Sequence, residues 1–568
     1  LCSTVHAQAP PILVDGRFDD WEGRIPAYDG TSRPPTNGID FGRVWIETSS
    51  AYLLIAVELD REFVLQEGNR LTLLLDTDMD AGTGSPTGGI GAELVWAFGD
   101  RRGAIHPASG AQNIGHADIG LIAAPTVSST RFEIAISLDA SPGGWKLFPG
   151  DSLRFVMIDR SSGNQAPAAG EDAIAIAITR SAEVHLGTDD LRRRGDVLRM
   201  MAYNIENDGL FDPARTSSYD RIFKATNPDV ILFVEIREHS HGQTADRIEQ
   251  FLPSGPGTQW FSSATGSDIV IVSRFPILRS FAINQTPRSG NSAFLLDLSR
   301  QFDNDLLVVG AHLPCCGNDD ARQDEADELM AFIRDAIADG TIANETPFMV
   351  TGDLNLVGDA QQLQTLVAGE IVAGFFKPSF EPDWDGSNLS DLAPPVTAAP
   401  FTYTWMNRQS SFHPGRLDFF IYSDAVTGVS KGFGLDSREL SAEALVQTGL
   451  RPADTRIASD HLPIVADFDF RVSTSTTRIE TRAKPLELYI YPNPSAGRLN
   501  LRVDLSQAGV ILIRIRDVAG RLVKSIDSRH LSAGRHDLVT DLDLPSGVYI
   551  ATLLGPTGQT SAKFVVFH

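Results

Sequence analysis

The pattern of apolar and polar residues along this 568-residue chain changes at about Asp196, and this change constrains the fold more than any other feature. Before it, short apolar runs alternate with Gly, Pro and Asp turns, a pattern typical of an all-β sandwich. From Asp196 to Phe470, apolar strands alternate with amphipathic helices, the clearest of which covers residues 322–337. The second pattern indicates a separate domain built from both strands and helices, called the α+β domain below.

Composition divides the chain further. The segments are a signal-peptide remnant at 1–9 that ends in Ala-Gln-Ala, a β-sandwich at 10–182, the α+β domain at 196–470, a Ser/Thr-rich linker at 471–485 and a small β-sandwich at 486–568. The boundaries fall in polar stretches. They predict that a fragment of residues 190–472 folds and works without either flank.

Charge and cysteine content exclude several classes of protein. A formal net charge of -25 argues against a protein that holds polyanions by bulk attraction, but not against an enzyme that holds one phosphate through a metal ion. Only Cys2, Cys315 and Cys316 are present, so no disulfide framework is expected; the adjacent pair is either two thiols or a strained disulfide. No run approaches the ~20 apolar residues of a membrane span.

Polar side chains follow several apolar strands at the point where each strand ends. In TGDLNL, a strand delivers Asp353 and Asn355 to the same side, because side chains alternate with period two. A carboxylate and an amide pointing one way suit a metal ion or a phosphate, although Asp and Asn also simply make turns. LLVVGAHL delivers His312 in the same manner.

A second group of candidates surrounds SDHLPI. Asp460 and His461 precede an apolar strand, and an imidazole titrates near neutrality, which suits an acid or base. Asp418 lies inside the apolar strand RLDFFIYS; a buried acid needs a partner, and a histidine is the obvious one. A lone histidine is more often structural, and the chain has 12 of them.

Two further strands carry oxygen ligands. In MAYNIEN, Asn204 and Glu206 are expected on one face of a strand, and DVILFVEI ends in Glu235. Two acids and an amide at separate strand ends form the kind of oxygen-rich set that Mg²⁺ uses.

In chain order these motifs resemble the endonuclease/exonuclease/phosphatase superfamily, which includes deoxyribonuclease I-like nucleases, abasic-site endonucleases, neutral sphingomyelinases and inositol-phosphate phosphatases. The resemblance disfavours the abasic-site branch, which carries a Tyr where this chain has His312. The resemblance rests on Asn-x-Glu, the strand ending in Glu, Ser-Arg-x-Pro-Ile, His-Leu, Gly-Asp-x-Asn, Arg-Leu-Asp and Ser-Asp-His, and it covers the whole third segment. It implies a four-layer αββα sandwich with the site at one open edge.

The same resemblance implies roles for these residues. Glu235 would be the principal ligand of Mg²⁺ (or Mn²⁺), with Asn204, Glu206 and Asp460 lining the metal and phosphate region. Asp353 and Asn355 would position the attacking water and the phosphate. His461, oriented by Asp418, would be the general base or a phosphate stabiliser, and His312 a second catalytic histidine that also contacts phosphate. Whether one metal or two take part, and which group is the base, stays open.

The flanks resemble other modules. ILVDGRFDDWEG and LTLLLDTDMDAGTG resemble family 9-like carbohydrate-binding β-sandwiches, which implies contact with polysaccharide. There the alternating Asp76, Asp78 and Asp80 are candidate ligands of a structural Ca²⁺, although Ala81 excludes an EF-hand loop. Trp21 and Trp96 are either sugar-stacking platforms or, more in keeping with their type, core residues.

The C-terminal segment, from LYIYPNPSAGRLNL to SAKFVVF, resembles the type A sorting domain of the type IX secretion system. It implies a protein that is secreted or attached to the cell surface. The sequence as a whole therefore predicts a secreted, metal-dependent phosphodiesterase, expected as a monomer and acting on DNA or RNA. Phospholipid or sugar-phosphate esters are an alternative, and the loop at 380–395 either shapes such a pocket or is only a long connection. An adhesin whose catalytic site has lapsed is another alternative.

Overall fold

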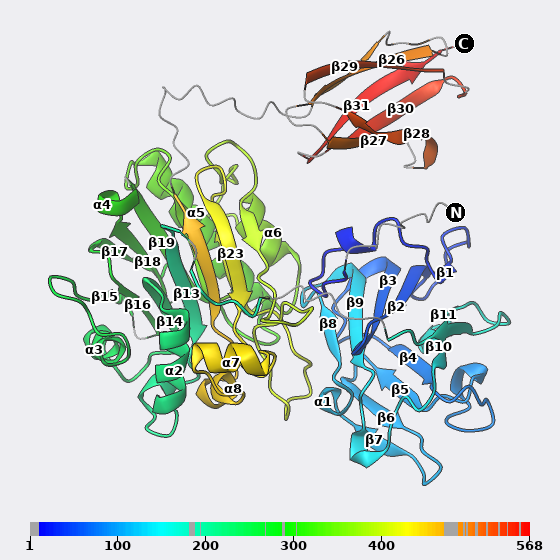
Figure 1. Ribbon diagram of the computed structural model, residues 1–568, viewed down its shortest axis with the longest axis horizontal. Coiled ribbons are helices and arrows are strands. Elements are labelled where there is room, and N and C mark those ends of the chain that lie inside the picture. Colours follow the sequence, from blue (N-terminus) through cyan, green and yellow to red (C-terminus); the bar gives the residue numbers. More distant parts are fainter. Residues whose placement is uncertain are drawn as a thin grey trace. The chain divides into compact units, whose positions relative to one another are not determined.

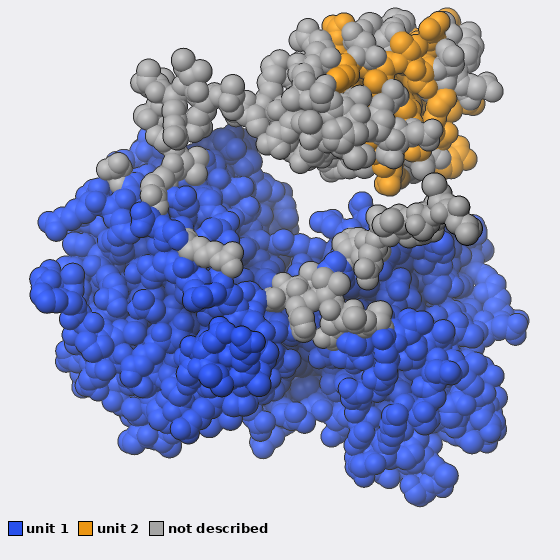
Figure 2. Space-filling model, viewed as in Figure 1, with its two compact units in different colours: residues 1–473 blue, residues 474–568 orange. Residues whose placement is uncertain are grey.

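The computed structural model describes residues 11–180, 188–193, 195–266, 268–286, 290–302, 304–470 and most of 487–567, the last with gaps at 492, 494, 496–497, 506–508, 518–520, 532–533, 542–543 and 556–557. The expected signal remnant and linker lie outside these residues. The chain divides into two compact units, Leu1–Ser473 and Thr474–His568 (Figure 2).

The N-terminal part, called the sandwich below, consists of two sheets. The first has the order β1-β2-β3-β9-β8: Tyr28–Asp29, Phe41–Thr48, Tyr52–Phe63, Ser129–Ser137 and Ile122–Ala124. The second has the order β11-β10-β4-β5-β6-β7, with β12 also paired to β10: Gln165–Ala166, Ser152–Asp159, Leu71–Asp76, Leu94–Ala97, Arg102–Ile105, Gln112–Ile114 and Ile174–Ala177. A four-residue helix α1, His116–Ile119, accompanies them.

Strand alternation explains how these two sheets pack. Leu71, Leu73 and Leu75 of β4 point into the core between the sheets, where residues of both sheets meet. Leu74 points the opposite way, into a smaller cluster with Ile90. A strand covered on both faces reads as a continuous apolar run, which is why LTLLLD shows no polar alternation.

The α+β domain has two six-stranded sheets (Figure 1). The β13 sheet has the order β15-β16-β14-β13-β24-β23: Phe261–Ser263, Ile269–Ser273, Val230–Val234, Leu198–Asn204, Ile464–Asp469 and Gly428–Gly434. The β20 sheet has the order β17-β18-β19-β20-β22-β21: Ile277–Ile283, Asn291–Asp297, Asp305–His312, Phe348–Asp353, Asp418–Tyr422 and Ser390–Leu392. The helices are α2 to α8: Thr216–Thr226, His241–Phe251, Ser299–Phe302, Asp319–Ala338, Gln361–Ala368, Ala442–Thr448 and Asp454–Ala458.

Three core clusters hold these elements together. Met201 and Tyr203 of β13 pack against α2 and α3. Leu198, Met200 and Ala202 of the same strand point the other way, into a cluster shared with the β20 sheet. On the far face of the β20 sheet, α5 and α6 cover β19 and β20. The expected α+β sandwich is thus present, with helices α2 and α3 on one sheet and α5 and α6 on the other (Figure 1).

The structure contains the helix expected at 322–337 but changes the interpretation of the loop at 380–395. The helix expected at 322–337 lies within α5, with Leu329 and Ile333 fully buried. The loop at 380–395, considered as a pocket wall, instead supplies β21, which pairs with β22. Its Trp384 packs against the core on the α5 side. It is absent from the lining of the pocket of about 690 Å³ that is described below, because pairing at the sheet edge holds it elsewhere.

The sandwich shares a core with the α+β domain. Ile12, Trp21 and Trp45 of the sandwich lie in one buried cluster with Phe401 and Leu462. The backbones of Val14 and Phe401 form an isolated bridge.

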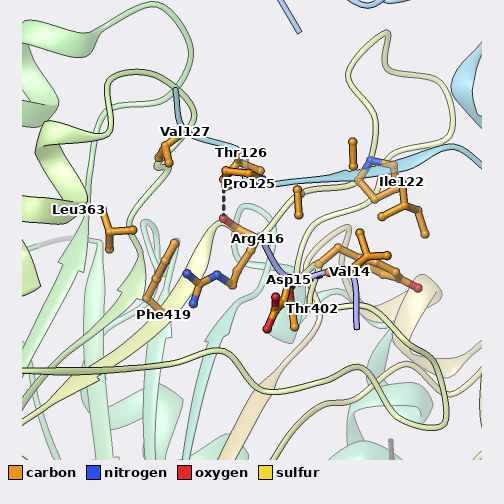
Figure 3. Close-up of a pocket in the computed structure, with 15 residues that line it drawn as sticks. Val14, Asp15, Ile122, Pro125, Thr126, Val127, Leu363, Thr402, Arg416 and Phe419 are labelled. Carbon is orange, nitrogen blue, oxygen red and sulfur yellow. Dashed lines mark hydrogen bonds between the residues drawn. The ribbon is translucent and has the colours of Figure 1, made fainter. Parts of the chain in front are cut away.

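Figure 3 shows part of this junction: a narrow cavity of about 30 Å³ lies between Val14, Ile122 and Thr126 on one side and Leu363, Arg416 and Phe419 on the other. The hydroxyl of Thr126 donates to the carbonyl oxygen of Arg416 at 3.4 Å. The two parts are therefore packed as one unit.

The C-terminal unit is a separate small sandwich with its own core. One sheet has the order β25-β26-β29 and the other β28-β27-β30-β31: Glu487–Tyr491, Arg498–Leu505, Gly534–Asp541, Leu522–Leu531, Gly509–Asp517, Gly547–Gly555 and Gly558–Val566. Among the described residues of the whole chain, no helix has the length and apolarity needed to cross a membrane.

The shared core leads to a prediction about fragments, and it argues against the independence that the polar boundaries suggested. We expect residues 10–472 to be soluble and to unfold cooperatively. We expect residues 190–472 to aggregate, because loss of the sandwich exposes Phe401, Tyr403 and Leu462. Size-exclusion chromatography and thermal unfolding of the two fragments test this. A monodisperse shorter fragment with the same Tm as the longer one would show that the shared core is dispensable.

Candidate active site

Three neighbouring strands of the β20 sheet align three of the predicted residues. The parallel pairing of β19 with β20 places His312 beside Asp353, and the antiparallel pairing of β20 with β22 places Asp353 beside Asp418. Gly352 makes the first pairing feasible: its φ is +127°, and a Cβ there would lie 2.2 Å from the carbonyl oxygen of Ala311. The glycine of the Gly-Asp-x-Asn motif thus serves strand packing.

The β13 sheet brings two more residues to this row. Asn204 is the last residue of β13, and Glu235 directly follows β14, which runs parallel to it. The amide of Asn204 donates to Oε1 of Glu235 at 3.2 Å and to Oδ2 of Asp353 at 3.0 Å, and so connects the two sheets. Glu235 has a φ of +69°, a strained conformation for a non-glycine residue, and its Oε2 accepts the backbone N–H of Asn207 at 2.7 Å.

Two histidine–aspartate pairs flank Asp353. Nδ1 of His461 lies 2.8 Å from Oδ2 of Asp418, and Nδ1 of His312 lies 2.6 Å from Oδ2 of Asp268. Both Nε2 atoms lie 3.7 Å from the same oxygen, Oδ2 of Asp353. Each imidazole is therefore oriented by a carboxylate behind it and directs its other nitrogen toward one central carboxylate.

Burial and charge set the pKa values in this network. Burial raises the pKa of Asp353 to about 6, against the opposing effect of the His461 and His312 charges. Burial lowers the pKa of His461, but Asp418 and Asp353 outweigh it and raise the value to about 10. Likewise, burial lowers the pKa of His312 while the hydrogen bond to Asp268 and the charge of Asp353 raise it to about 9. Both shifts favour the charged form of the imidazoles, which carries a proton on each nitrogen.

The remaining predicted residues lie around this centre. Oδ2 of Asp460 accepts the indole N–H of Trp405 at 3.0 Å. The amide of Asn355 donates to the carbonyl oxygen of Leu313 at 3.0 Å, and so fixes the chain just after His312.

Glu206 differs from the expectation. The strand ends at Asn204, and Glu206 has a φ of +52°, so the two residues do not share a strand face. The carboxylate of Glu206 instead pairs with Arg215 at 2.6 Å. The alternation argument failed here because it assumed that the strand continues past Asn204.

These side chains surround one pocket of about 690 Å³, called the central pocket below. Of the predicted residues, the lining contains Glu206, Glu235, His312, Asp353, Asn355, Asp460 and His461. Asn204 and Asp418 lie behind it and reach it through the hydrogen bonds given above. Cys315 and Cys316 also line the pocket and are free, exposed thiols.

The donor set fits a divalent cation. Asp353, Asp418 and His461 offer ligand atoms that lie within 4.8 Å of one another. One carboxylate oxygen of Asp418 and one of Asp268 are buried without a hydrogen-bond partner among the described residues. With Glu235, these carboxylates outnumber the two imidazoles, so the network has an excess of negative charge that a cation would balance.

Sequence reasoning missed residues whose side chains support this centre. Asp268 orients His312, and Arg237 lies within 3.8 Å of Glu235 and 3.7 Å of Asp268. The sequence did contain a signal for Asp268, because this acid directly precedes the apolar strand β16. Strand β16 runs antiparallel to β14, so the start of β16 lies beside the end of β14 that carries Glu235.

In the sandwich, the structure changes the expected calcium set. Asp76 and Asp78 lie together with Glu93, within 4.8 Å of one another, and Asp80 is not part of this group. Asp76 also accepts a hydrogen bond from Arg154 at 2.7 Å, which offsets part of the negative charge. Trp21 and Trp96 are each only 1% exposed, so they are core residues and not sugar platforms.

Comparisons with known proteins agree with this picture. Residues 201–461 match the model of the Endonuclease/Exonuclease/phosphatase family, and residues 489–567 match the model of the Secretion system C-terminal sorting domain. No curated protein matches the chain.

Solved structures similar to the chain include TDP2 from C. elegans, with 17% identity, 48% of this chain and 77% of that chain covered, and a TM-score of 0.31. ANGEL2, a 2',3'-cyclic phosphatase, is 17% identical; the match covers 48% of this chain and 96% of that chain, with a TM-score of 0.34. An AP endonuclease from Archaeoglobus fulgidus is 10% identical; the match covers 48% of this chain and 99% of that chain, with a TM-score of 0.30.

Two parts of the chain are thereby assigned. The C-terminal unit is a sorting domain that directs export through the type IX secretion system. Residues 201–461, which carry the paired histidines of the central pocket, match the Endonuclease/Exonuclease/phosphatase family, and the chain is a phosphoric ester hydrolase.

Proposed function

We propose that this protein is an exported, divalent-metal-dependent phosphodiesterase that hydrolyses nucleic acid strands. The observation that carries the proposal is the arrangement around Asp353, whose Oδ2 faces two carboxylate-backed imidazoles and the amide of Asn204. Hydrolysis of a phosphodiester needs groups that activate water and groups that offset negative charge on the phosphate oxygens. This network contains both kinds. The stacked clusters α2/α3, β13 sheet, β20 sheet and α5/α6 support a four-layer αββα arrangement.

Glu235, Asn204 and Asp460 would hold the cation, with Glu206 at the edge of the same pocket. Mg²⁺ or Mn²⁺ suits such oxygen ligands, and when bound it supplies positive charge to the phosphate. Glu235 is the principal candidate for the metal ligand. Its carboxylate accepts hydrogen bonds from the amide of Asn204 and from the N–H of Asn207, and its ion-pair partner among the described residues, Arg237, is 3.8 Å away.

The chain's own residues would do the acid–base work. Asp353 lies at the centre and is the proposed acceptor of the proton from the attacking water. Nε2 of His461 and Nε2 of His312, each held by a carboxylate at Nδ1, would donate to phosphate oxygens. Asn355 would keep the segment after His312 in place through its bond to Leu313.

The pocket favours a nucleic acid over a lipid or sugar phosphate. Trp405 and Phe412 line it together with Arg237, and aromatic rings beside a cation suit stacked bases and a phosphate backbone. The loop at 380–395, considered as one wall of a lipid or sugar-phosphate pocket, is not part of the lining.

Finer expectations stay predictions. They are release from or attachment to the cell surface, a monomeric state, and contact between the sandwich and polysaccharide, which would need residues other than the buried Trp21 and Trp96. For Ca²⁺ in the sandwich, the proposed ligands become Asp76, Asp78 and Glu93.

The first prediction concerns the metal. EDTA should abolish hydrolysis of bis-p-nitrophenyl phosphate, and Mg²⁺ or Mn²⁺ should restore it. Glu235→Gln should raise the Mg²⁺ concentration for half activity by roughly tenfold or more, because a neutral amide is a poorer ligand than a carboxylate. Glu238→Gln is the matched control, since Glu238 is exposed and lies outside the pocket. Equal Mg²⁺ requirements in both variants would remove Glu235 from the metal site.

The second prediction concerns the imidazole. His461→Ala should lower kcat by ~10²–10⁴-fold at saturating Mg²⁺, the usual contribution of a positioned proton donor or acceptor. Asp353→Asn should lose at least as much, because it contacts both imidazoles. His241→Ala, an exposed histidine on α3, should retain wild-type kcat. A His461→Ala variant that folds and keeps kcat within twofold would refute the proposed roles.

The third prediction uses pH and stability in EDTA. The pKa of His461 is raised from 6.5 to about 10, so the folded state binds its proton more tightly than the unfolded state. The resulting stabilisation is complete below pH 6.5 and is lost as pH rises through about 10. Asp418→Asn should reduce this loss, so that the Tm difference from wild type shrinks between pH 6.5 and 10.

Asp320→Asn, an exposed position at the start of α5, is the control and should follow the wild-type curve. NMR titration of the His461 ring should show its pKa fall toward 6.5 in Asp418→Asn. An unchanged pKa would mean that Asp418 does not hold the charged imidazole.

A further inference from the structure

A second cavity, of about 410 Å³, adjoins the central pocket and is called the arginine cavity below. Glu206 and Asp460 line both cavities, so they mark the junction between them. Beyond this junction the lining changes character. It contains Arg408, Arg438 and Arg456. Four polar residues also line this cavity: Asn407, Gln409, Thr455 and Ser459. Glu206 and Asp460 thus belong to both linings, whereas these three arginines line the arginine cavity and not the central pocket.

The three arginines differ in the partners of their guanidinium groups. Arg438 is committed to the buried carboxylate of Asp436, with Nε at 2.9 Å from Oδ1 and a second contact to Oδ2. That contact raises the pKa of Arg438 further, so this residue is a fixed part of the wall. Arg408 is exposed, and its described hydrogen bond is to the carbonyl oxygen of Ala117 at 3.4 Å. Arg456, exposed on α8, has no acidic partner among the described residues.

Neither Arg408 nor Arg456 has a carboxylate partner among the described residues, in a chain with 73 acidic and 48 basic residues. Other arginines near the site do form ion pairs, as Arg215 does with Glu206 and Arg416 with Asp391. Arg408 and Arg456 come from separate segments, the connection after Trp405 and helix α8, and line the same cavity. Two guanidinium groups in the lining of one cavity suit a phosphate group, which accepts several hydrogen bonds at once.

We propose that the arginine cavity binds the phosphate group next to the scissile one, through Arg408 and Arg456. The inference rests on the proposed function and deepens it: the substrate is a linear chain of phosphodiesters, and a strand leaves the central pocket past Asp460 and Glu206 to reach the arginines. In a protein of net charge -25, these local contacts supply the attraction that bulk charge does not. An isolated phosphodiester has no group to place there.

The test compares substrates with and without a flanking phosphate. Steady-state kinetics of wild type, Arg408→Gln, Arg456→Gln and the double variant are measured with Mg²⁺ on bis-p-nitrophenyl phosphate, a thymidine dinucleotide and a thymidine hexanucleotide. Arg451→Gln is the matched control, because Arg451 is exposed on the segment just before α8 and does not line the cavity.

We expect each cavity variant to lose roughly tenfold in kcat/KM on the hexanucleotide, mainly through KM, as one charge-assisted hydrogen bond predicts. Activity on bis-p-nitrophenyl phosphate and on the dinucleotide should change less than twofold, and the control should match wild type. Equal losses on all three substrates, or no loss on the hexanucleotide, would overturn the proposal.

A binding measurement separates this inference from the proposed function. Fluorescence anisotropy of a labelled hexanucleotide in EDTA requires no catalysis. The double variant should bind at least tenfold more weakly than wild type, and the dependence of log Kd on log salt should be shallower. If wild type cleaves none of the substrates, the proposed function fails. If the double variant then binds the hexanucleotide as tightly as wild type does, the phosphate subsite fails as well.

Discussion

The register of three adjacent strands is the constraint on which the rest of the candidate active site depends. Parallel pairing of β19 with β20 and antiparallel pairing of β20 with β22 place His312, Asp353 and Asp418 in one row. A shift of one residue in either pairing would turn a side chain to the opposite face of the sheet. The Cβ-free Gly352 permits the close approach, and the amide of Asn204 then joins this row to the β13 sheet.

The sandwich is part of the same folded unit and not an appended module. Its buried Trp21 and Trp45 share a cluster with Phe401 and Leu462, the second of which directly follows His461. Gln66 and Glu67 of the sandwich also line the central pocket. The position of His461 therefore depends in part on packing from outside the α+β domain, because Leu462 contributes to a core that both parts complete.

Motifs at strand ends predicted several of the residues that gather in the central pocket. Asp353, His312, His461 and Glu235 could be named because each is a polar residue at the end or start of an apolar strand, where a core has no need of it. Glu206 was misplaced on a strand face, since a left-handed residue ends the alternation. Asp268 was missed, because its role appears only when β16 is paired antiparallel with β14.

The sequence by itself determined the segments, the alternation of strands and helices, and the residue types that could perform phosphate chemistry, because these follow from local periodicity and composition. The tertiary structure alone decided which residues meet. It placed Asp268 behind His312, put Glu93 instead of Asp80 beside Asp76, and gathered Arg408 and Arg456 around one cavity. The physical reason is that such contacts join residues far apart in the chain, and strand pairing and helix packing, not local sequence, set the distances between them.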